Sequence, residues 1–202
     1  MQLTYASASP FARMVRVLLH ETGQTDDVEL LNVVTTPVAT DPVVAAANPV
    51  GKIPALIRPD SPAIYDSRVI CRFLDDRAGG GYYPENRLWD TLTIEATAQG
   101  ILDAAILVVY EGRVRPPEKV YEVWMDAQWD KVMRSVSALN TRWMSHLNGP
   151  LDMGQIAVGC ALGYLDFRHS ARGWRKGNDA LAEWFEVFAE RPSMVATRPS
   201  DG

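Results

Sequence analysis

The stretch from Asn48 to Leu56, with the sequence Asn-Pro-Val-Gly-Lys-Ile-Pro-Ala-Leu, constrains the fold more than any other part of the chain. Two prolines and a glycine frame a single apolar residue, Ile53, directly before a short strand-like run. Pro54 has a fixed φ and no N–H, so it sets the conformation in which the chain enters that strand. A proline at a tight strand entry is a candidate for a cis peptide bond, which is otherwise uncommon.

The same stretch predicts a binding site for an extended peptide. If the bond before Pro54 is cis, the backbone N–H and C=O of Ile53 turn outward and can pair with a ligand as an added strand would. Further on, Asp66 precedes Ser67, where a helix is expected to open. Because the N–H groups of a helix N-terminus hold carboxylates, the two segments together predict a site for a small, anionic peptide.

The first eighty residues alternate between strand and helix signals. Ser9-Pro10 and Asp41-Pro42 each combine a capping side chain with a proline at the first helical position. The compact strand–helix–strand at the start implies parallel pairing. The order βαβαββα is the arrangement of a thioredoxin-like domain. The expected strands are 2–5, 28–34, 53–57 and 63–65, and the expected helices are 10–22, 42–47 and 67–78.

After Asn86 the strand signals end and only helical patterns remain. Asp152 and Gln155 form a capping box ahead of a helix that is apolar on nearly all sides, so that helix is expected to be buried. The sequence therefore predicts a thioredoxin-like domain over 1–79, a linker over 80–86 and an all-helical domain over 87–202. The expected helices of the second domain are 88–113, 117–147, 156–167 and 178–189.

Composition limits the kinds of partner. The 202 residues carry a formal net charge of −5 without any run of Lys or Arg, which argues against nucleic acid and anionic membranes. The longest apolar run, Ala104 to Tyr110, falls far short of the ~20 residues that span a membrane. Cys71 and Cys160 belong to no metal-binding pattern, so we expect two buried thiols, no metal site and a soluble, cytoplasmic protein.

The motif over 48–56, followed by Tyr-Asp-Ser-Arg-Val-Ile over 65–70, closely resembles the glutathione-binding half of cytosolic glutathione S-transferases. Ser9-Pro10-Phe11 and the stretch from Asp152 to Arg168 agree with it, so the resemblance covers nearly the whole chain. It implies the fold of that family, glutathione as co-substrate, a small-molecule electrophile as second substrate and a homodimer. The hydroxyl at Ser9 resembles the bacterial, serine-type members.

Ser9 is the residue expected to be catalytic. The thiol of glutathione is largely protonated at pH 7, because unperturbed thiols titrate near 8.5. A hydroxyl donor at a helix N-terminus favours the thiolate through a charge-assisted hydrogen bond. From the residues alone Ser9 also fits a plain helix cap. Ser7 in the same loop and Tyr5 at the end of the first strand remain alternatives as the thiolate contact.

The resemblance also assigns the peptide site. Ile53 is expected to bind the cysteinyl unit through its backbone. Ser67 is expected to hold the γ-glutamyl carboxylate, and Asp66 its ammonium group. Lys52 is a candidate partner for the glycyl carboxylate. The alternatives are that Ile53 is an ordinary residue at a strand start, that Asp66 and Ser67 only cap a helix, and that Lys52 is a solvated lysine. The residues expected to bind glutathione are Ser9, Val50, Lys52, Ile53, Pro54, Asp66 and Ser67.

The electrophile is expected where the helical domain overhangs the first helix. Phe11 is a candidate for the floor of this site, and Tyr110 and Arg113 for its lining. In some family members an acid at the place of Asp103 reaches the amine of glutathione in the partner subunit. A salt bridge between helices is the alternative for Asp103.

The function predicted is a glutathione transferase that adds the thiolate to an electrophilic carbon. A glutathione-dependent peroxidase and a non-catalytic module of this fold that binds a protein partner are the alternatives. Because Ile53-Pro54, Asp66-Ser67 and Ser9 are all present, the sequence favours a working thiol site. A dimer is expected because the helix over 88–113 is too apolar to be covered within one short domain.

Overall fold

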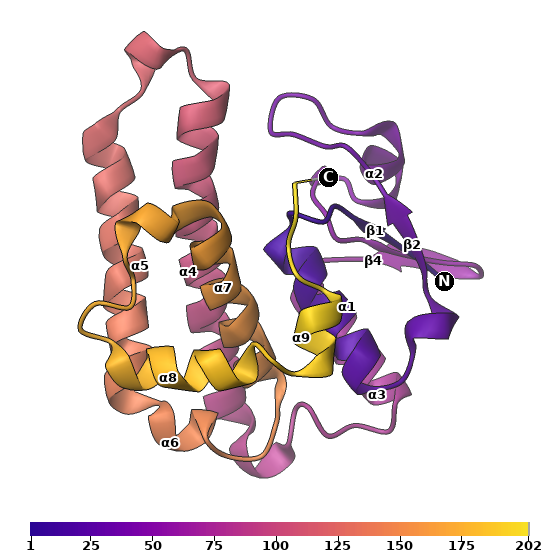
Figure 1. Ribbon diagram of the computed structural model, residues 1–202. Coiled ribbons are helices and arrows are strands. Elements are labelled where there is room, and N and C mark those ends of the chain that lie inside the picture. Colours follow the sequence, from indigo (N-terminus) through magenta and orange to yellow (C-terminus); the bar gives the residue numbers. More distant parts are fainter. Residues whose placement is uncertain (202) are drawn as a thin grey trace. The chain divides into compact units, whose positions relative to one another are not determined.

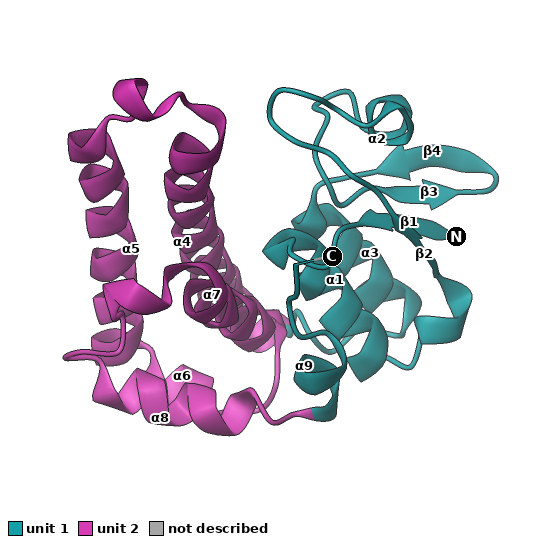
Figure 2. Cartoon of the chain, turned by 45° about the horizontal axis from the view of Figure 1, so that its top comes forward, with its two compact units in different colours: residues 1–84, 192–202 teal, residues 85–191 magenta. Residues whose placement is uncertain are grey.

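The computed structural model describes residues 1–201, which form two compact units (Figure 2). The first unit contains residues 1–84 and the C-terminal segment that begins at Pro192, and the second contains residues 85–191. The sequence predicted this C-terminal segment within the helical domain, whereas the structure packs it in the first unit.

The first unit holds a four-stranded mixed sheet in the order β2-β1-β3-β4. β1 runs parallel to β2 and antiparallel to β3, and β3 and β4 form a hairpin. The element order βαβαββα and the parallel first pair confirm the thioredoxin-like prediction. The strands are β1 Gln2–Tyr5, β2 Glu29–Asn32, β3 Leu56–Arg58 and β4 Ser61–Ile64.

The hairpin turn is tighter than predicted. Arg58 pairs with Ser61, so the turn is Pro59-Asp60 and not the whole stretch 58–62. The guanidinium of Arg58 donates twice to the carbonyl of Pro62, at 3.0 and 2.7 Å. Pro62 cannot donate to the ladder, but its carbonyl accepts these bonds, which keeps this proline-rich segment extended.

Three helices flank the sheet, and the C-terminal segment contributes a fourth. The three are α1 Pro10–Glu21, α2 Pro42–Ala47 and α3 Ser67–Arg77, and the fourth is α9 Pro192–Ala196. α1 and α3 pack together on one face of the sheet, and α2 lies on the other face (Figures 1 and 2). Both predicted caps are present. Oγ of Ser9 accepts from the N–H of Ala12 at 3.2 Å, and Oδ1 of Asp41 accepts from that of Val43 at 2.8 Å.

A buried arginine explains why the C-terminal segment belongs to the first unit. Arg13 of α1 is only 4% exposed. Its guanidinium donates to the carbonyl of Met194 at 3.0 Å and to Oγ1 of Thr197 at 3.4 Å. Because a buried charge without hydrogen-bond partners is costly, these acceptors fix α9 against α1.

The second unit is helical throughout its described residues. α4 packs against both α5 and α7 (Figure 1), and α7 is buried on nearly every side, as predicted. By length and composition alone, residues 85–114 are long and apolar enough to span a membrane. Half of the most apolar window is buried in the protein, which is the pattern of a core helix. The helices are α4 Leu88–Val114, α5 Glu122–Arg142, α6 Met144–Leu147, α7 Met153–His169 and α8 Asp179–Phe188.

The predicted capping box of α7 is the centre of a buried polar network. Asp152 is fully buried and caps the helix with Gln155 in reciprocal hydrogen bonds. Its Oδ2 also accepts from Oγ1 of Thr91 at 2.9 Å, and lies 2.7 Å from Nε2 of His146 and 3.4 Å from Nη2 of Arg87. One carboxylate therefore joins the starts of α4 and α7 to α6.

We expect Asp152→Ala to lower the free energy of unfolding of the helical unit by about 3–5 kcal/mol, because it leaves several buried groups without their acceptor. Urea denaturation followed by circular dichroism measures the loss. Asp130→Ala, an exposed position on α5, is the matched control and should change stability by less than about 0.5 kcal/mol. Equal effects of the two substitutions would show that the network is not what holds these helices together.

Candidate functional site

The loop ahead of β3 is wrapped around the buried side chain of Asn48. Its Nδ2 donates to the carbonyl of Lys52 at 2.8 Å, and its Oδ1 accepts from the N–H of Val50 at 2.9 Å. The N–H of Gly51 donates to the carbonyl of Asn48 at 2.8 Å. Gly51 has φ of +70°, a left-handed conformation that glycine adopts without steric cost. One amide thus sets the path of the whole loop and leaves Val50 and Lys52 exposed.

The end of this loop is fixed to β1 by Thr4, whose importance the sequence did not reveal. The N–H of Thr4 donates to the carbonyl of Ala55 at 2.9 Å, and the N–H of Ala55 donates to Oγ1 of Thr4 at 2.8 Å. The Ile53–Pro54 bond is cis. Within the described residues, neither backbone polar group of Ile53 has a hydrogen-bond partner. Backbone groups left unpaired in this way can pair with an extended ligand.

The start of α3 is capped by Asp66, and Ser67 is its buried first residue. Oδ1 of Asp66 accepts from the N–H of Arg68 at 3.0 Å, and Oδ2 forms an ion pair with Nη2 of Arg68 at 2.9 Å. Partial burial raises the pKa of Asp66, but the hydrogen bonds and charge of Arg68 outweigh it, so this pKa lies below its ordinary value. Asp66 therefore already has a cationic neighbour, Arg68, which the sequence did not single out.

Of the three hydroxyls proposed as the thiolate contact, only Ser9 lies at a helix N-terminus. In its capping bond the oxygen accepts from Ala12, so the hydroxyl proton remains able to donate to another group. Ser7 lies in the preceding turn and is half-buried. The ring of Tyr5 packs against the guanidinium of Arg16, 5.1 Å from the ring centre, so part of this side chain is engaged with α1.

Strand directions bring these segments to one edge of the sheet. β3 runs antiparallel to both β1 and β4. Its first residue, Leu56, pairs with Ile64 at the end of β4, and Ala55 just before it is bonded to Thr4 near the end of β1. Ser9 follows the end of β1, Ile53 precedes the start of β3, and Ser67 follows the end of β4. This edge therefore combines a hydroxyl donor, unpaired backbone and a helix N-terminus, which suits a thiol-containing peptide with a carboxylate.

The candidates for the second substrate fall in different units. Phe11 is a half-buried residue of α1, whereas Asp103, Tyr110 and Arg113 are exposed positions along α4 in the helical unit. Burial raises the pKa of Tyr110, and the nearby charge of Arg113 opposes this. Both phenol and guanidinium are accessible to a ligand.

Two residues of α7 that the sequence did not single out join this pair. Tyr164 is 5% exposed, and burial raises its pKa to about 12 against the opposing charges of Arg168 and Arg113. The one available signal was the spacing of four residues between Tyr164 and Arg168, which puts both on one face of α7.

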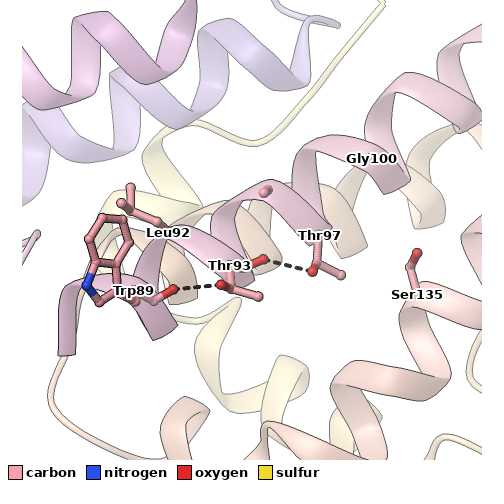
Figure 3. Close-up of a pocket in the computed structure, with 7 residues that line it drawn as sticks. Trp89, Leu92, Thr93, Thr97, Gly100 and Ser135 are labelled. Carbon is pink, nitrogen blue, oxygen red and sulfur yellow. Dashed lines mark hydrogen bonds between the residues drawn. The ribbon is translucent and has the colours of Figure 1, made fainter.

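A separate hollow of about 510 Å³ lies between α4 and α5 (Figure 3). Trp89, at its end, is 78% exposed. Along α4 the lining residues recur every three or four positions, and Asp103 is the next member of this series after Gly100. The residues that line the hollow are Trp89, Leu92, Thr93, Ala96, Thr97, Gly100 and Ser135.

Cys71 and Cys160 are both buried, as predicted, and form no disulfide within residues 1–201. Across the same residues, no three His, Cys, Asp or Glu side chains are grouped so that they could hold a metal ion.

Comparison with known proteins gives consistent matches. Residues 8–77 match the family model for the glutathione S-transferase N-terminal domain, and residues 122–186 match that for the C-terminal domain. The chain is 31% identical to the uncharacterized GST-like protein YibF of Escherichia coli (strain K12) over 98% of both chains. A glutathione transferase family member from Pseudomonas fluorescens Pf-5, with bound glutathione, has 45% identity and a TM-score of 0.95 over 99% of both chains. A second crystal structure from that organism, with bound S-(propanoic acid)-glutathione, has 43% identity and a TM-score of 0.92 over the full length of both chains.

The conformation of the loop over 48–55 predicts opposite effects for two glycine substitutions. Gly51→Ala should destabilise the first unit by about 1–2 kcal/mol, because alanine disfavours positive φ and the new Cβ would lie 3.1 Å from Thr40. Gly112→Ala in α4 meets no atom within 4 Å and should stabilise the protein by about 0.5 kcal/mol. Chemical denaturation of both variants measures the difference. Equal effects would show that the left-handed turn does not constrain the loop.

Proposed function

Because the chain belongs to the glutathione S-transferase family, we propose that it activates the thiol of glutathione for attack on an electrophilic small molecule. The observation that carries this proposal is the sheet edge where Ser9, the unpaired backbone of Ile53 and the start of α3 converge. The glutathione bound by the Pseudomonas fluorescens relative, which matches almost the entire chain, supports the same ligand here.

In this proposal the peptide lies extended along the edge. Its cysteinyl unit pairs with the N–H and C=O of Ile53 beside Pro54, and its γ-glutamyl carboxylate lies at Ser67 on the N-terminus of α3. Asp66 receives the ammonium group, which must share this carboxylate with Arg68. The exposed residues Val50 and Lys52 border the glycyl end, where Lys52 offers a charge to the second carboxylate.

The chemistry requires a thiolate and a nearby acceptor. The hydroxyl of Ser9 donates a hydrogen bond to the sulfur, and the thiol proton passes to solvent. The polarity of the α1 N-terminus adds to this stabilisation. The thiolate then forms a bond to an electrophilic carbon, and the leaving group departs with its electron pair. No covalent bond to the protein forms, so the contribution of the protein is activation and proximity.

The bound ligand of a relative favours conjugation as the reaction. S-(propanoic acid)-glutathione, bound in the second Pseudomonas fluorescens structure, is glutathione with a carbon substituent on sulfur. We therefore place carbon–sulfur bond formation ahead of peroxide reduction. Two buried cysteines without a disulfide in the described chain fit the reducing environment of the cytoplasm, where we place the protein.

The proposal makes Ser9 the residue that lowers the thiol pKa. Ser9→Ala should lower kcat/KM about ten- to a hundredfold, since a hydrogen bond to a charged group contributes roughly 1.5–3 kcal/mol. Glutathione affinity should change little. Steady-state kinetics with 1-chloro-2,4-dinitrobenzene, together with a pH titration of the bound thiol, measures both effects.

Ser7→Ala is the matched control, because it removes a hydroxyl from the same loop, and its kinetics should resemble the wild type. If Ser9→Ala keeps full activity and an unchanged thiol titration, Ser9 is not the activating group. Loss of activity in Ser7→Ala or Tyr5→Phe would then identify the correct one. Glutathione binding without turnover of any electrophile or peroxide would favour a non-catalytic module.

We also propose a homodimer formed through α4. The hollow in Figure 3 and the exposed Trp89 and Leu107 lie on one stripe of this helix, with the small residues Ala96 and Gly100 between them. A two-fold axis across the stripe would bury this apolar surface. Asp103, on the same stripe, would then lie close to the boundary and approach the amine of glutathione in the other copy.

Sedimentation velocity at micromolar concentration tests the dimer, with an expected mass of twice the 22.4 kDa chain. Gly100→Glu should give a monomer, because it places a charge on the axis, whereas Gly112→Glu, off the stripe on the same helix, should remain a dimer. Asp103→Ala should weaken glutathione binding by more than the ~0.5 kcal/mol of an ordinary surface change. A wild-type monomer that turns over glutathione would exclude both the dimer and this role of Asp103.

A further inference from the structure

We propose that Thr4 is a positioning residue for the peptide ligand, because its hydroxyl holds residues 53–55 in the conformation that the ligand meets. This inference rests on the proposed function, since the ligand is taken to be glutathione at the sheet edge. It goes further than that proposal in one respect. Thr4 is fully buried, so part of the glutathione affinity is assigned to a side chain that the ligand does not touch.

At Thr4 the pairing of β1 with β3 changes from backbone to side chain. Leu3 lies opposite Leu56 in this antiparallel pair, so Thr4 and Ala55 are next in register. In a regular ladder a hydrogen-bonded pair of residues exchanges two backbone hydrogen bonds. The first is present, from the N–H of Thr4 to the carbonyl of Ala55 at 2.9 Å. The N–H of Ala55 donates instead to Oγ1 of Thr4 at 2.8 Å, so the hydroxyl replaces a backbone acceptor.

The hydroxyl of Thr4 contacts both backbone polar groups of Ala55. Besides accepting from the N–H, its Oγ1 donates to the carbonyl of Ala55 at 3.3 Å. Both residues are fully buried, and a buried donor that loses its acceptor is costly. Removal of this one oxygen would therefore leave the N–H of Ala55 without the acceptor that fixes it.

Ile53 lies between this anchor and a second one. On the other side, Nδ2 of Asn48 donates to the carbonyl of Lys52 at 2.8 Å. Pro54 has no N–H, so the N–H of Ala55 is the first backbone donor that follows the N–H of Ile53. Side chains thus fix the backbone on both sides of Ile53 before any ligand binds. A pre-formed backbone loses little freedom on binding, which favours affinity.

The anchor at Thr4 should affect binding and leave the chemical step unchanged. The backbone of Ile53 is proposed to pair with backbone groups of the cysteinyl unit, and these groups do not react. An interaction that is equally strong in the ground state and the transition state lowers KM without changing kcat. Loss of the Thr4 hydroxyl is therefore expected to raise the Kd and KM of glutathione, whereas loss of the Ser9 hydroxyl is expected to lower the rate.

Two substitutions at this position separate the hydroxyl from the packing of the side chain. Thr4→Val keeps the volume and loses the oxygen, and Thr4→Ser keeps the oxygen and loses a methyl group. Because ordering the backbone of one residue on binding costs about tenfold in affinity, Thr4→Val should raise the Kd of glutathione about tenfold. We expect Thr4→Ser to keep the affinity of the wild type. Calorimetry measures Kd, and kinetics with 1-chloro-2,4-dinitrobenzene should show an unchanged kcat in both variants.

Thr22→Val is the matched control in the same unit. The hydroxyl of Thr22 also donates once and accepts once, to the carbonyl of Leu18 at 2.7 Å and from Nε2 of Gln24 at 2.8 Å, but it lies at the far end of α1 from Ser9. This variant should keep the Kd of the wild type. If Thr4→Val does not fold, Thr4→Ala and Thr22→Ala give the same comparison.

The outcomes separate this inference from the proposed function. An unchanged Kd in Thr4→Val, or a rise that Thr4→Ser or Thr22→Val shares, would overturn the positioning role and leave the transferase proposal intact. A rise in Kd confined to Thr4→Val, in a protein whose wild type binds glutathione and turns over no electrophile, would support the positioning role and overturn the transferase proposal.

Discussion

The three hydrogen bonds between Thr4 and Ala55 mark where the pairing of β1 with β3 ends. Beyond this pair no backbone hydrogen bond joins these two segments within residues 1–201, and the backbone polar groups of Ile53 are left without a partner at the sheet edge. A longer β1–β3 ladder would have used the groups that are proposed to bind the peptide. Asn48 supports the same arrangement from the other side, because it fixes the loop internally and requires no contact with the sheet edge. The proposed binding site thus lies where the pairing of β1 with β3 stops.

In the helical unit, several acidic side chains are bound by neighbouring side chains of the same unit. Asp152 gathers its hydrogen bonds in the interior, and this fixes α4 relative to α6 and α7. Glu111 forms an ion pair with Arg115, and Asp166 forms one with Arg175. The exposed stripe that begins at Trp89 is chemically different, since it is apolar and contains small residues. This exposed stripe is the surface through which we propose that a second copy of the chain binds.

Sequence signals between residues a few positions apart were sufficient to predict most of the fold. Ser9 and Asp41 cap the helices they were predicted to cap, and the Asp152–Gln155 box is present in full, because these signals involve only residues a few positions apart. Pairings between distant residues were not accessible in the same way. Nothing near Arg13 in the sequence indicates that its acceptors lie at Met194 and Thr197, so the position of α9 was missed.

For the site, the motif over 48–56 indicated the peptide edge because proline and glycine restrict the backbone strongly. Thr4 and Arg68 carried no such signal, since their hydrogen bonds and ion pair depend on neighbours that only the folded chain supplies.

A crystal structure of the protein with glutathione tests the central claim most directly. The account predicts that the cysteinyl unit pairs with the N–H and C=O of Ile53, that the γ-glutamyl carboxylate lies at Ser67, and that the sulfur lies within hydrogen-bond distance of Oγ of Ser9. Glutathione bound away from Ile53, or at this edge with its sulfur against Ser7 or Tyr5, would contradict it.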